Sequence, residues 1–340
     1  MKTRIGIWLL ALAVFLPACH QKDNPEESGK DLTVIFATTT GLAGDGYNEP
    51  ILKALMESVS AQPDVTVHLL KPDNLAEARR QFNEWLAGAD DNKALILCGP
   101  EFETLADGVS LEKGRILLLD SDKSFGDGIS TALLKRYGGA WLAGAIMKDF
   151  QVRLLKGLDG DRIIDATCQG LEDGYKENGG ADFQKYVLST GYEGLDMADE
   201  LYSILMIQDE VDMPDSKTDG VFIPVCGASR LGAFSFSRRL YWAFVGIGDE
   251  CSSYSEYLPF SLLLDLGSVV KEYVADWVRG DSWATHADYG LATGHVRISF
   301  SERFYHQPLG SIWPLSMSEW EALVDGYKEN ALEKEVGHVY

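Results

Sequence analysis

The feature that most constrains the fold is a series of short, wholly apolar segments separated by single helical segments. Residues 32–38 (LTVIFAT), 94–98 (ALILC) and 115–119 (RILLL) are such runs. Because they lack the alternation of a strand with one solvated face, they predict strands buried on both faces, as in parallel sheets covered by helices. A single helix between consecutive strands favours right-handed βαβ units. The sequence therefore predicts an α/β fold with doubly wound parallel sheets.

The strand-and-helix pattern occurs twice, which agrees with the two domains expected for a chain of 340 residues. Residues 149–161 interrupt the pattern between the two sets, and we expect the chain to form two doubly wound lobes joined by a hinge. The second set is expected to begin with a strand at 162–167 and a helix through residue 175. Beyond it we expect a long helix at 258–279, a strand near 296–300 and a final helix at 318–332.

The first nineteen residues have the organisation of an export signal. A short basic start precedes an uncharged run at 5–16, which suits a signal peptide but is too short for a spanning helix of about 20 residues. Residues 16–19 (LPAC) resemble the bacterial lipobox, in which cleavage precedes a cysteine that becomes lipidated. The resemblance implies a signal peptide at 1–18 and a lipid-bearing, palmitoylated Cys19. The alternatives are an uncleaved anchor and an ordinary buried cysteine.

An exported lipoprotein would hold its soluble body close to a membrane. The polar residues that follow the lipobox, up to residue 31, predict a tether. We expect attachment to the cell membrane or the outer membrane, with the body facing the periplasm or the cell surface. Outside residues 1–19 the sequence contains no membrane-directed run, which excludes a multispan transporter.

Charge excludes a second class of function. Thirty Lys and Arg against 52 Asp and Glu give a formal net charge of −22. Nucleic-acid binding proteins normally carry a basic surface, so no nucleic-acid partner is expected. The apolar content of 46% supplies a large core and argues against a disordered chain.

The four cysteines beyond the lipobox admit two interpretations. Cys98, Cys168, Cys226 and Cys251 could form disulfides in an exported protein, and four cysteines allow three pairings. The sequence has no CxxC motif, so a zinc site is not indicated. We favour small buried thiols over a disulfide.

Catalytic motifs are incomplete. The glycine-rich loop at 41–46 matches neither GxGxxG nor a phosphate-binding loop, and residues 227–231 lack the last glycine of GxSxG. The six histidines form no HExxH motif. We therefore predict that the chain is not an enzyme and that it needs no cofactor or metal.

Polar and aromatic residues follow several predicted strands, at the carboxyl ends where open α/β sheets bind ligands. Carboxylates accept hydrogen bonds, an amide both donates and accepts, and aromatic rings stack on flat ligands. A tight turn or a helix cap is the alternative explanation for each loop. The candidate ligand-binding residues are Asp45, Tyr47, Asn48, Asp120, Asp122, Phe125, Gly227 and Asp249.

The order of several motifs carries a family resemblance. The lipobox, GLAGDGYN, LLLDSD, YGGAWLAGAIMK (137–148), VCGASRLG and FVGIGDE resemble the Med/basic-membrane-protein lipoproteins. Those proteins are purine-nucleoside-binding components of ABC importers with a periplasmic-binding-protein type I fold. The resemblance implies that Asn48 matches a family Asn and that Tyr47 replaces a Phe. It also implies that Asp120 contacts the purine and that Gly227 lies near the ribose.

The sequence departs from the family pattern at the positions that contact the ribose in that family. The Asp of the family's Gly-x-Asp ribose clamp is shifted onto Asp249 or lost. An early family Asp aligns with Thr38, and a late Lys aligns with Leu264. These departures weaken the expectation of a ribose more than the expectation of the fold.

The resemblance also implies an organisation into lobes. We expect one lobe from residues 32–130 and 250–285 and the other from residues 131–249 and 286–340. The expected function is a monomeric, lipid-anchored solute-binding protein. It would capture a nucleoside or related small molecule between the lobes and present it to an ABC permease.

Two alternatives remain open. One is a surface or periplasmic lipoprotein that senses or scavenges a sugar-like ligand without a permease. The other is a lipid-anchored hydrolase that uses Asp120, Asp122 and Ser229.

Overall fold

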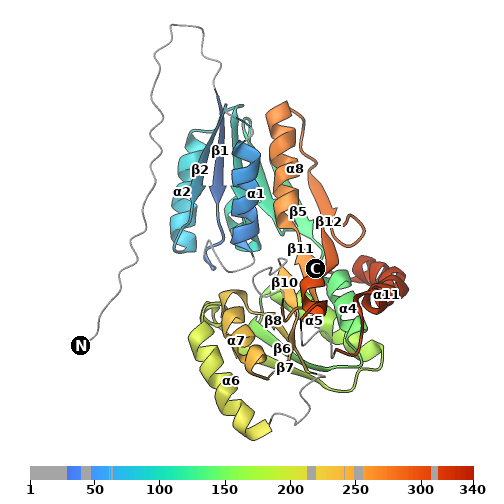
Figure 1. Ribbon diagram of the computed structural model, residues 1–340. Helices are drawn as coiled ribbons and strands as arrows, with labels where there is room; N and C mark the ends of the chain where they lie inside the picture. The colour runs from blue at the N-terminus through green and yellow to red at the C-terminus, as the bar shows by residue number, and fades with distance from the viewer. Residues whose placement is uncertain are drawn as a thin grey trace, which may run out of the picture.

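The computed structural model describes residues 29–39, 47–60, 62, 64–212, 220–240, 242–248, 256–307 and 313–340. They form two doubly wound parallel sheets and a smaller mixed sheet, which confirms the predicted fold class (Figure 1). We call the six-stranded sheet and its helices the first lobe, and the other two sheets and their helices the second lobe.

The six-stranded sheet of the first lobe has the order β12-β5-β4-β3-β1-β2, and all of its pairings are parallel. Its strands are β1 (Lys30–Ile35), β2 (Val65–Leu70), β3 (Lys93–Leu97), β4 (Arg115–Leu119), β5 (Ile129–Leu134) and β12 (His286–Tyr289). Its helices are α1 (Asn48–Ser60), α2 (Leu75–Ala87), η1 (Pro100–Phe102), α3 (Glu103–Ala106) and α8 (Leu266–Arg279).

The second lobe contains a four-stranded parallel sheet, β7-β6-β8-β9, and a three-stranded sheet, β10-β11-β13. Its strands are β6 (Gln151–Leu158), β7 (Phe183–Ser189), β8 (Gly220–Val225), β9 (Ala243–Phe244), β10 (Gly246–Gly248), β11 (Phe260–Leu264) and β13 (Val296–Phe300). Its helices are α4 (Tyr137–Ile146), α5 (Arg162–Glu177), η2 (Tyr192–Leu195), α6 (Ala198–Asp212), η3 (Gly227–Ser229), α7 (Arg230–Leu240), α9 (Glu302–Tyr305) and α11 (Met317–Gly337).

Successive side chains of the buried strands enter different apolar clusters. On β1, Val34 belongs to the cluster that includes Ile51 of α1 and Val270 of α8. The next residue, Ile35, belongs to the cluster that includes Phe82 of α2. Side chains alternate across a strand, so a strand with helices on both faces needs apolar residues at every position. This explains the continuous apolar runs in the sequence.

Close contact between two helices fixes the core of the second lobe. A Cβ atom on Gly174 of α5 would lie 1.9 Å from the carbonyl oxygen of Trp141 in α4, and one on Gly144 would lie 2.1 Å from the carbonyl oxygen of Leu171. Only glycine lets the two backbones approach this closely.

Within the described residues the chain passes between the lobes three times. It crosses between β5 and α4, between β11 and α8, and between β12 and β13. Figure 1 shows β10 and β11 between the first sheet above and the β6-β7-β8 sheet below. Crossing segments that join two lobes are the positions at which a hinge can act.

The start of the second set was predicted wrongly. Residues 151–158, expected to interrupt the pattern, form β6, and residues 162–167, expected as a strand, begin α5. Two cations hid the strand: Arg153 and Lys156 are buried and pair with carboxylates. The Asp161 side chain caps α5 by accepting the backbone N–H groups of the second and third residues of the helix.

The prediction of a helix at 258–279 is also wrong for the first third of that range. Residues 260–264 form β11, and α8 begins only after Asp265, whose side chain accepts the N–H of Ser268. An apolar run at a helix start cannot be separated from a buried strand by periodicity alone.

Strand pairing moves all three expected lobe boundaries. β5 lies wholly in the first sheet, so the boundary falls after residue 134 instead of residue 130. Residues 286–289, expected in the second lobe, form β12 beside β5, whereas β11 belongs to the second lobe. The chain changes lobe within short connections that carry no compositional signal. The signal peptide and the tether lie outside the described residues, apart from residues 29–31.

The prediction of buried thiols is confirmed for Cys98, Cys168 and Cys226, which are free and buried. Burial raises the pKa of the Cys168 thiol to about 12, so it stays protonated and unreactive. Cys251 lies outside the described residues. Among the helices described, none is long and apolar enough to span a membrane.

Candidate functional site

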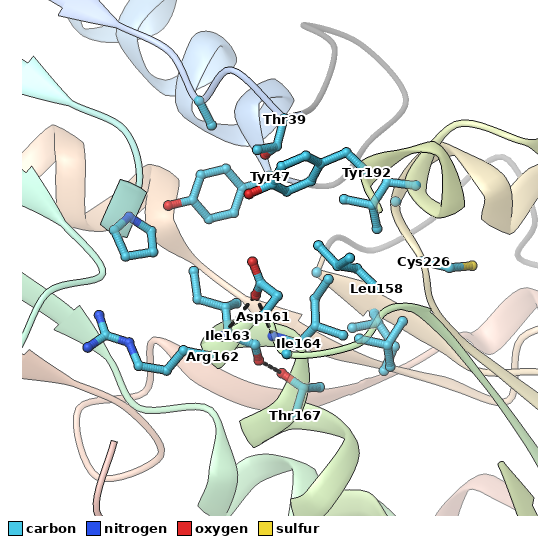
Figure 2. A pocket seen from close by; sticks show the side chains of 18 of the residues that line it. Thr39, Tyr47, Leu158, Asp161, Arg162, Ile163, Ile164, Thr167, Tyr192 and Cys226 are labelled. Carbon is cyan, nitrogen blue, oxygen red and sulfur yellow. Dashed lines mark hydrogen bonds between the residues drawn. The ribbon is translucent and has the colours of Figure 1, made fainter. Parts of the chain in front are cut away.

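A cavity of about 620 Å³ lies between the lobes (Figure 2). Residues of both lobes line it, and they come from the carboxyl ends of parallel strands and the helix starts that follow them. The principal residues on the first-lobe wall are Tyr47, Glu101, Glu103 and Arg136; those on the second-lobe wall are Asp161, Ile163, Ile164, Tyr192 and Gly227.

A buried ion pair supports the first-lobe wall. The Asp120 carboxylate accepts hydrogen bonds from both terminal nitrogens of Arg136, each at 2.7 Å, and the two side chains are 0% and 2% exposed. The Tyr47 hydroxyl donates to the same carboxylate at 2.8 Å. This contact fixes the phenol and leaves the Tyr47 ring on the cavity wall. Burial, with Asp120 next, raises the pKa of Tyr47 well above its usual value, so the hydroxyl remains a donor.

The backbone at Asp120 is unusual as well. Asp120 has φ +58° and is, among the described residues, the non-glycine residue with positive φ. The Leu134 N–H also donates to its carboxylate, at 3.3 Å. The Asp120 side chain therefore has its acceptors occupied by the protein and does not line the cavity. The implied contact between Asp120 and a purine is not what the structure shows.

Asn48 joins two elements instead of facing the cavity. Its side chain is buried, and it accepts from the N–H and donates to the carbonyl of Ala37, both at 3.2 Å. It thereby ties the end of β1 to the start of α1.

Glu101 brings a carboxyl group to the cavity from the loop after β3. Its Oε1 accepts the Thr38 N–H at 3.1 Å. Gly99, with φ +137°, lies so close that a Cβ there would be 2.3 Å from Glu101 Oε2, so glycine is needed at this turn. Burial raises the pKa of Glu101 to about 7, and the negative charges of Asp161 and Asp120 add to the effect. Glu101 is thus poised between its two protonation states near neutral pH.

The start of α5 forms the second-lobe wall. Asp161 Oδ1 accepts from the N–H groups of Ile163 and Ile164, both at 3.0 Å. In Figure 2 the Asp161 carboxylate points toward Tyr47 and Tyr192, and the two isoleucines lie on the Asp161 side. Tyr192, on η2, is 52% exposed, which leaves its ring accessible. This wall combines apolar surface with one carboxylate.

At Gly227 the second-lobe wall is formed by the backbone, because the residue has no side chain. Gly227 has φ +54°, and a Cβ there would lie 3.0 Å from the carbonyl oxygen of Leu195. A side chain would therefore be strained and crowded at this position, where Gly227 lines the cavity.

Arg162 bridges the two lobes at the edge of the cavity. From the first turn of α5 it donates to Glu103 Oε1 and Asp122 Oδ1, both at 3.0 Å, and to the carbonyl oxygen of Asp120 at 2.8 Å. All three acceptors belong to the first lobe. The positive φ of Asp120 orients the carbonyl that receives this contact. Arg162 therefore fastens the closed arrangement from one side.

The structure brings few of the predicted site residues to the cavity. Tyr47 and Gly227 line it, whereas Asn48, Asp120, Asp122 and Phe125 do not. Asp122 pairs with Arg162, and Phe125 packs against the apolar cluster of α2 and α3 on the other face of the sheet. Asp45, Asp249 and the lipidation candidate Cys19 lie outside the described residues.

Four residues that sequence reasoning missed contribute to the cavity: Glu101, Asp161, Arg162 and Tyr192. The signal for Asp161 was present, since an aspartate after a glycine and before an apolar pair is a typical helix start. Reading 162–167 as a strand concealed it. Glu101 and Tyr192 had no such signal, because each lies in a short 3-10 helix after a strand, whose position depends on the fold.

The described residues do not assemble a hydrolytic centre. The Ser229 hydroxyl is buried, donating to the carbonyl of Gly194 at 2.9 Å and accepting the Met197 N–H at 2.8 Å. Asp120 and Asp122 are engaged with arginines. No group of three or more potential metal ligands occurs within the described part of the chain.

Comparison with known proteins identifies the fold. No family model and no curated relative matches the sequence. An ABC transporter solute-binding protein from Aeropyrum pernix K1 is similar in structure, with 17% identity, 90% of both chains covered and a TM-score of 0.67. A transcriptional activator of the comK gene from Bacillus halodurans has 15% identity, covers 88% of this chain and 98% of its own, and gives a TM-score of 0.63.

A solute-binding protein of an ABC transporter system from Conexibacter woesei has 13% identity, covers 91% of this chain and 98% of its own, and has a TM-score of 0.63. Further similar structures contain bound myo-inositol, D-allose or L-arabinofuranose. These four structures are of ABC transporter binding proteins. The likeness shows that the chain has the periplasmic-binding-protein type I fold.

Proposed function

We propose that this chain is a lipid-anchored solute-binding protein that captures a nucleoside or a related small molecule between its lobes for an ABC importer. The observation that carries the proposal is the interlobe cavity of about 620 Å³ with walls from both lobes. Cavities of roughly 300–1,000 Å³ are typical of small-molecule sites. The fold shared with transporter solute-binding proteins supports the same conclusion.

The chemistry of the walls suits a flat, hydroxylated ligand. Tyr47 and Tyr192 offer ring faces, and Ile163 and Ile164 offer apolar surface on the Asp161 side of the view in Figure 2. Aromatic and aliphatic surfaces hold a planar ring, and a few polar groups fix its orientation.

Closure of the lobes would transmit binding to a permease. Arg162 contacts three first-lobe acceptors, and these contacts exist only when the lobes are together. A ligand that touches both walls binds the closed form more tightly and therefore raises its population. A permease that binds the closed form would then respond to ligand.

Ligand identification tests the proposal directly. The full-length chain is purified from its membrane, any small molecule released on denaturation is identified by mass spectrometry, and nucleosides and sugars are screened by thermal shift. A ligand that binds the native state raises the melting temperature. We expect a nucleoside or a related compound to do so, and Tyr192→Ala to weaken the effect. A chain that carries and binds no small molecule would contradict the proposal.

Anchoring and transport are tested separately. Cys19→Ala should release the protein from membranes and abolish incorporation of a labelled fatty acid. Deletion of a permease that copurifies with the wild-type protein should stop ligand uptake.

A second candidate is a lipoprotein that senses or scavenges a sugar-like ligand without a permease. The acidic side chains of the cavity favour it, because carboxylates bind sugar hydroxyls as readily as ribose. Sugar binding without any associated permease would favour this candidate over the first.

A further inference from the structure

Two carboxyl groups from different lobes line the cavity without a cationic partner among the residues that the structure describes. Glu101 belongs to the first lobe and Asp161 to the second. Of the basic residues that the structure describes, none has a nitrogen within 4.0 Å of either carboxylate. Each carboxylate keeps acceptor capacity, since Glu101 Oε1 accepts one backbone N–H and Asp161 Oδ1 accepts two.

The other acidic residues of the cavity are already neutralised. Glu103 pairs with Lys123 and Arg162, and Asp159 pairs with Lys156. Glu101 and Asp161 therefore differ from their neighbours in being available to a ligand.

The two carboxyl groups line the same cavity from opposite lobes. Burial is the main cause of the raised pKa values of Glu101 and Tyr192, and the charge on Asp161 adds to both, as does that on Glu101 for Tyr192. Like charges that approach in a partly dehydrated space repel each other unless one is protonated or a donor lies between them. A ligand with donors directed at both groups removes this repulsion and favours the closed form.

The basic residues of the cavity do not turn it into a site that prefers anionic ligands. Arg136 is bound to Asp120 through two hydrogen bonds, and Arg162 is held by Glu103 and Asp122. Arg230 also lines the cavity and is buried, so it is the group that would favour an anion. An anionic ligand would meet this arginine together with two unpaired carboxylates.

We propose that Glu101 and Asp161 are specificity-determining residues that together select a ligand with hydrogen-bond donors on both sides and no net negative charge. The inference deepens the proposed function and rests on it. The donors are hydroxyl groups or protonated amines, and phosphorylated or carboxylated forms of the ligand are rejected. A reaction that removes phosphate would have to precede capture of a solute that is present as a phosphate ester.

Matched ligand pairs test the selectivity. Isothermal titration of the full-length chain compares inosine with inosine 5′-monophosphate, myo-inositol with myo-inositol 1-phosphate, and spermidine as the cationic probe. We expect the neutral or cationic member to bind at least about tenfold more tightly than its anionic counterpart, a difference of about 1.4 kcal/mol. Equal or tighter binding of a phosphate overturns the inference and leaves the proposed function standing. If no probe and no copurified molecule binds, the proposed function itself fails.

Substitutions assign the selectivity to the pair. Glu101→Gln and Asp161→Asn should each weaken binding of the preferred probe by about tenfold to a hundredfold, since hydrogen bonds to charged groups contribute about 1.5–3 kcal/mol. Asn is as good a helix cap as Asp, so Asp161→Asn should leave α5 intact. The control is Asp165→Asn, which removes a carboxylate of α5 that pairs with Lys156 but does not line the cavity, and it should change affinity less than about twofold. Unchanged affinity in both test variants overturns the inference.

The number of protons released on ligand binding distinguishes a direct role of Glu101 from a purely structural one. A structural role would leave this number unchanged. Glu101 faces Asp161, Asp120, Tyr47, Tyr192 and Cys98, and the arginines that line the same cavity are Arg136, Arg162 and Arg230. With a pKa of about 7, Glu101 is about half protonated at pH 7, and a ligand donor favours its ionised form. Titration in buffers of different ionisation enthalpy should show release of up to about half a proton per ligand at pH 7. Glu101→Gln should abolish the release, and its persistence in that variant overturns the role of Glu101.

Discussion

The two walls of the cavity are built differently. On the first-lobe wall, Tyr47 donates to Asp120, which is locked to Arg136 beneath the surface. On the second-lobe wall, Tyr192 is half exposed, and the described contacts of the Asp161 carboxylate are with the N–H groups that it caps. The comparison indicates that the first-lobe wall is the more rigid of the two. Substitutions that separate stability from binding can test this division.

The largest expected change in the free energy of unfolding comes from breaking the buried ion pair between Asp120 and Arg136. Asp120→Ala leaves the Arg136 guanidinium buried without its counter-ion, so the free energy of unfolding should fall by about 3–5 kcal/mol. Denaturant titration measures it. Asp122→Ala, which removes a partly exposed partner of Arg162, should cost at most about 1 kcal/mol and serves as the control. Equal losses in the two variants would contradict a rigid first-lobe wall.

Glu101 should make stability depend on pH. Its pKa is about 7 in the folded chain, against 4.5 for an unperturbed glutamate, so the native state binds more protons than the unfolded chain between these two values. The stabilisation is complete below pH 4.5 and is lost as pH rises through 7, up to about 3 kcal/mol. Unfolding free energies of wild type and Glu101→Gln from pH 4 to 8 check this, because the variant should lack that decline. Parallel curves for the two proteins would show that Glu101 is not held protonated.

The two tyrosines give the sharpest matched comparison. Tyr47→Phe removes a donor to a buried carboxylate and should lower the free energy of unfolding by about 1.5–3 kcal/mol. Tyr192→Phe changes a half-exposed side chain and should remain within about 0.5 kcal/mol of wild type. Thermal and chemical denaturation of both variants provide the measurement. Similar costs at the two positions would show that the walls do not differ in rigidity.

The smallest expected effect is on the bridge between the lobes. Arg162→Met removes three contacts of a side chain that is 33% exposed, so stability should fall by no more than about 1 kcal/mol. The closed form should nevertheless become less populated, and small-angle X-ray scattering should show a larger radius of gyration without ligand. Lys123→Met is the control, because it removes a first-lobe partner of Glu103 without touching the second lobe. An unchanged radius in Arg162→Met would mean that other contacts hold the lobes together.

A strand or helix could be predicted from the sequence only where the pattern that identifies it lies within its own residues. The apolar runs of β3 and β4 were found because strands covered on both faces need apolar residues at every position. β6 was missed because Arg153 and Lys156 lie within it, and their buried charges are paired by Asp182, Asp159 and Asp165. Those partners lie outside the strand, so its own sequence could not reveal that the charges are compensated.

The predictions of the site residues succeeded or failed for the same reason. Tyr47 and Gly227 were predicted as cavity residues and line it, since loops at strand ends carry a local signal. Asp120 was predicted as a ligand contact, but Arg136 lies sixteen positions along the chain and occupies its carboxylate. The identity of a counter-ion is a property of the folded core.

The parallel α/β architecture and the polar loops at the strand ends could be predicted from the amino-acid sequence, because burial on two faces and strand ends produce patterns within a few residues. The tertiary structure alone decided which polar side chains remain available: it paired Asp120 with Arg136 and Glu103 with Arg162, and it left Glu101 and Asp161 without cations among the described residues. Pairing of charges depends on distances between elements that are remote in the chain, and only folding sets those distances.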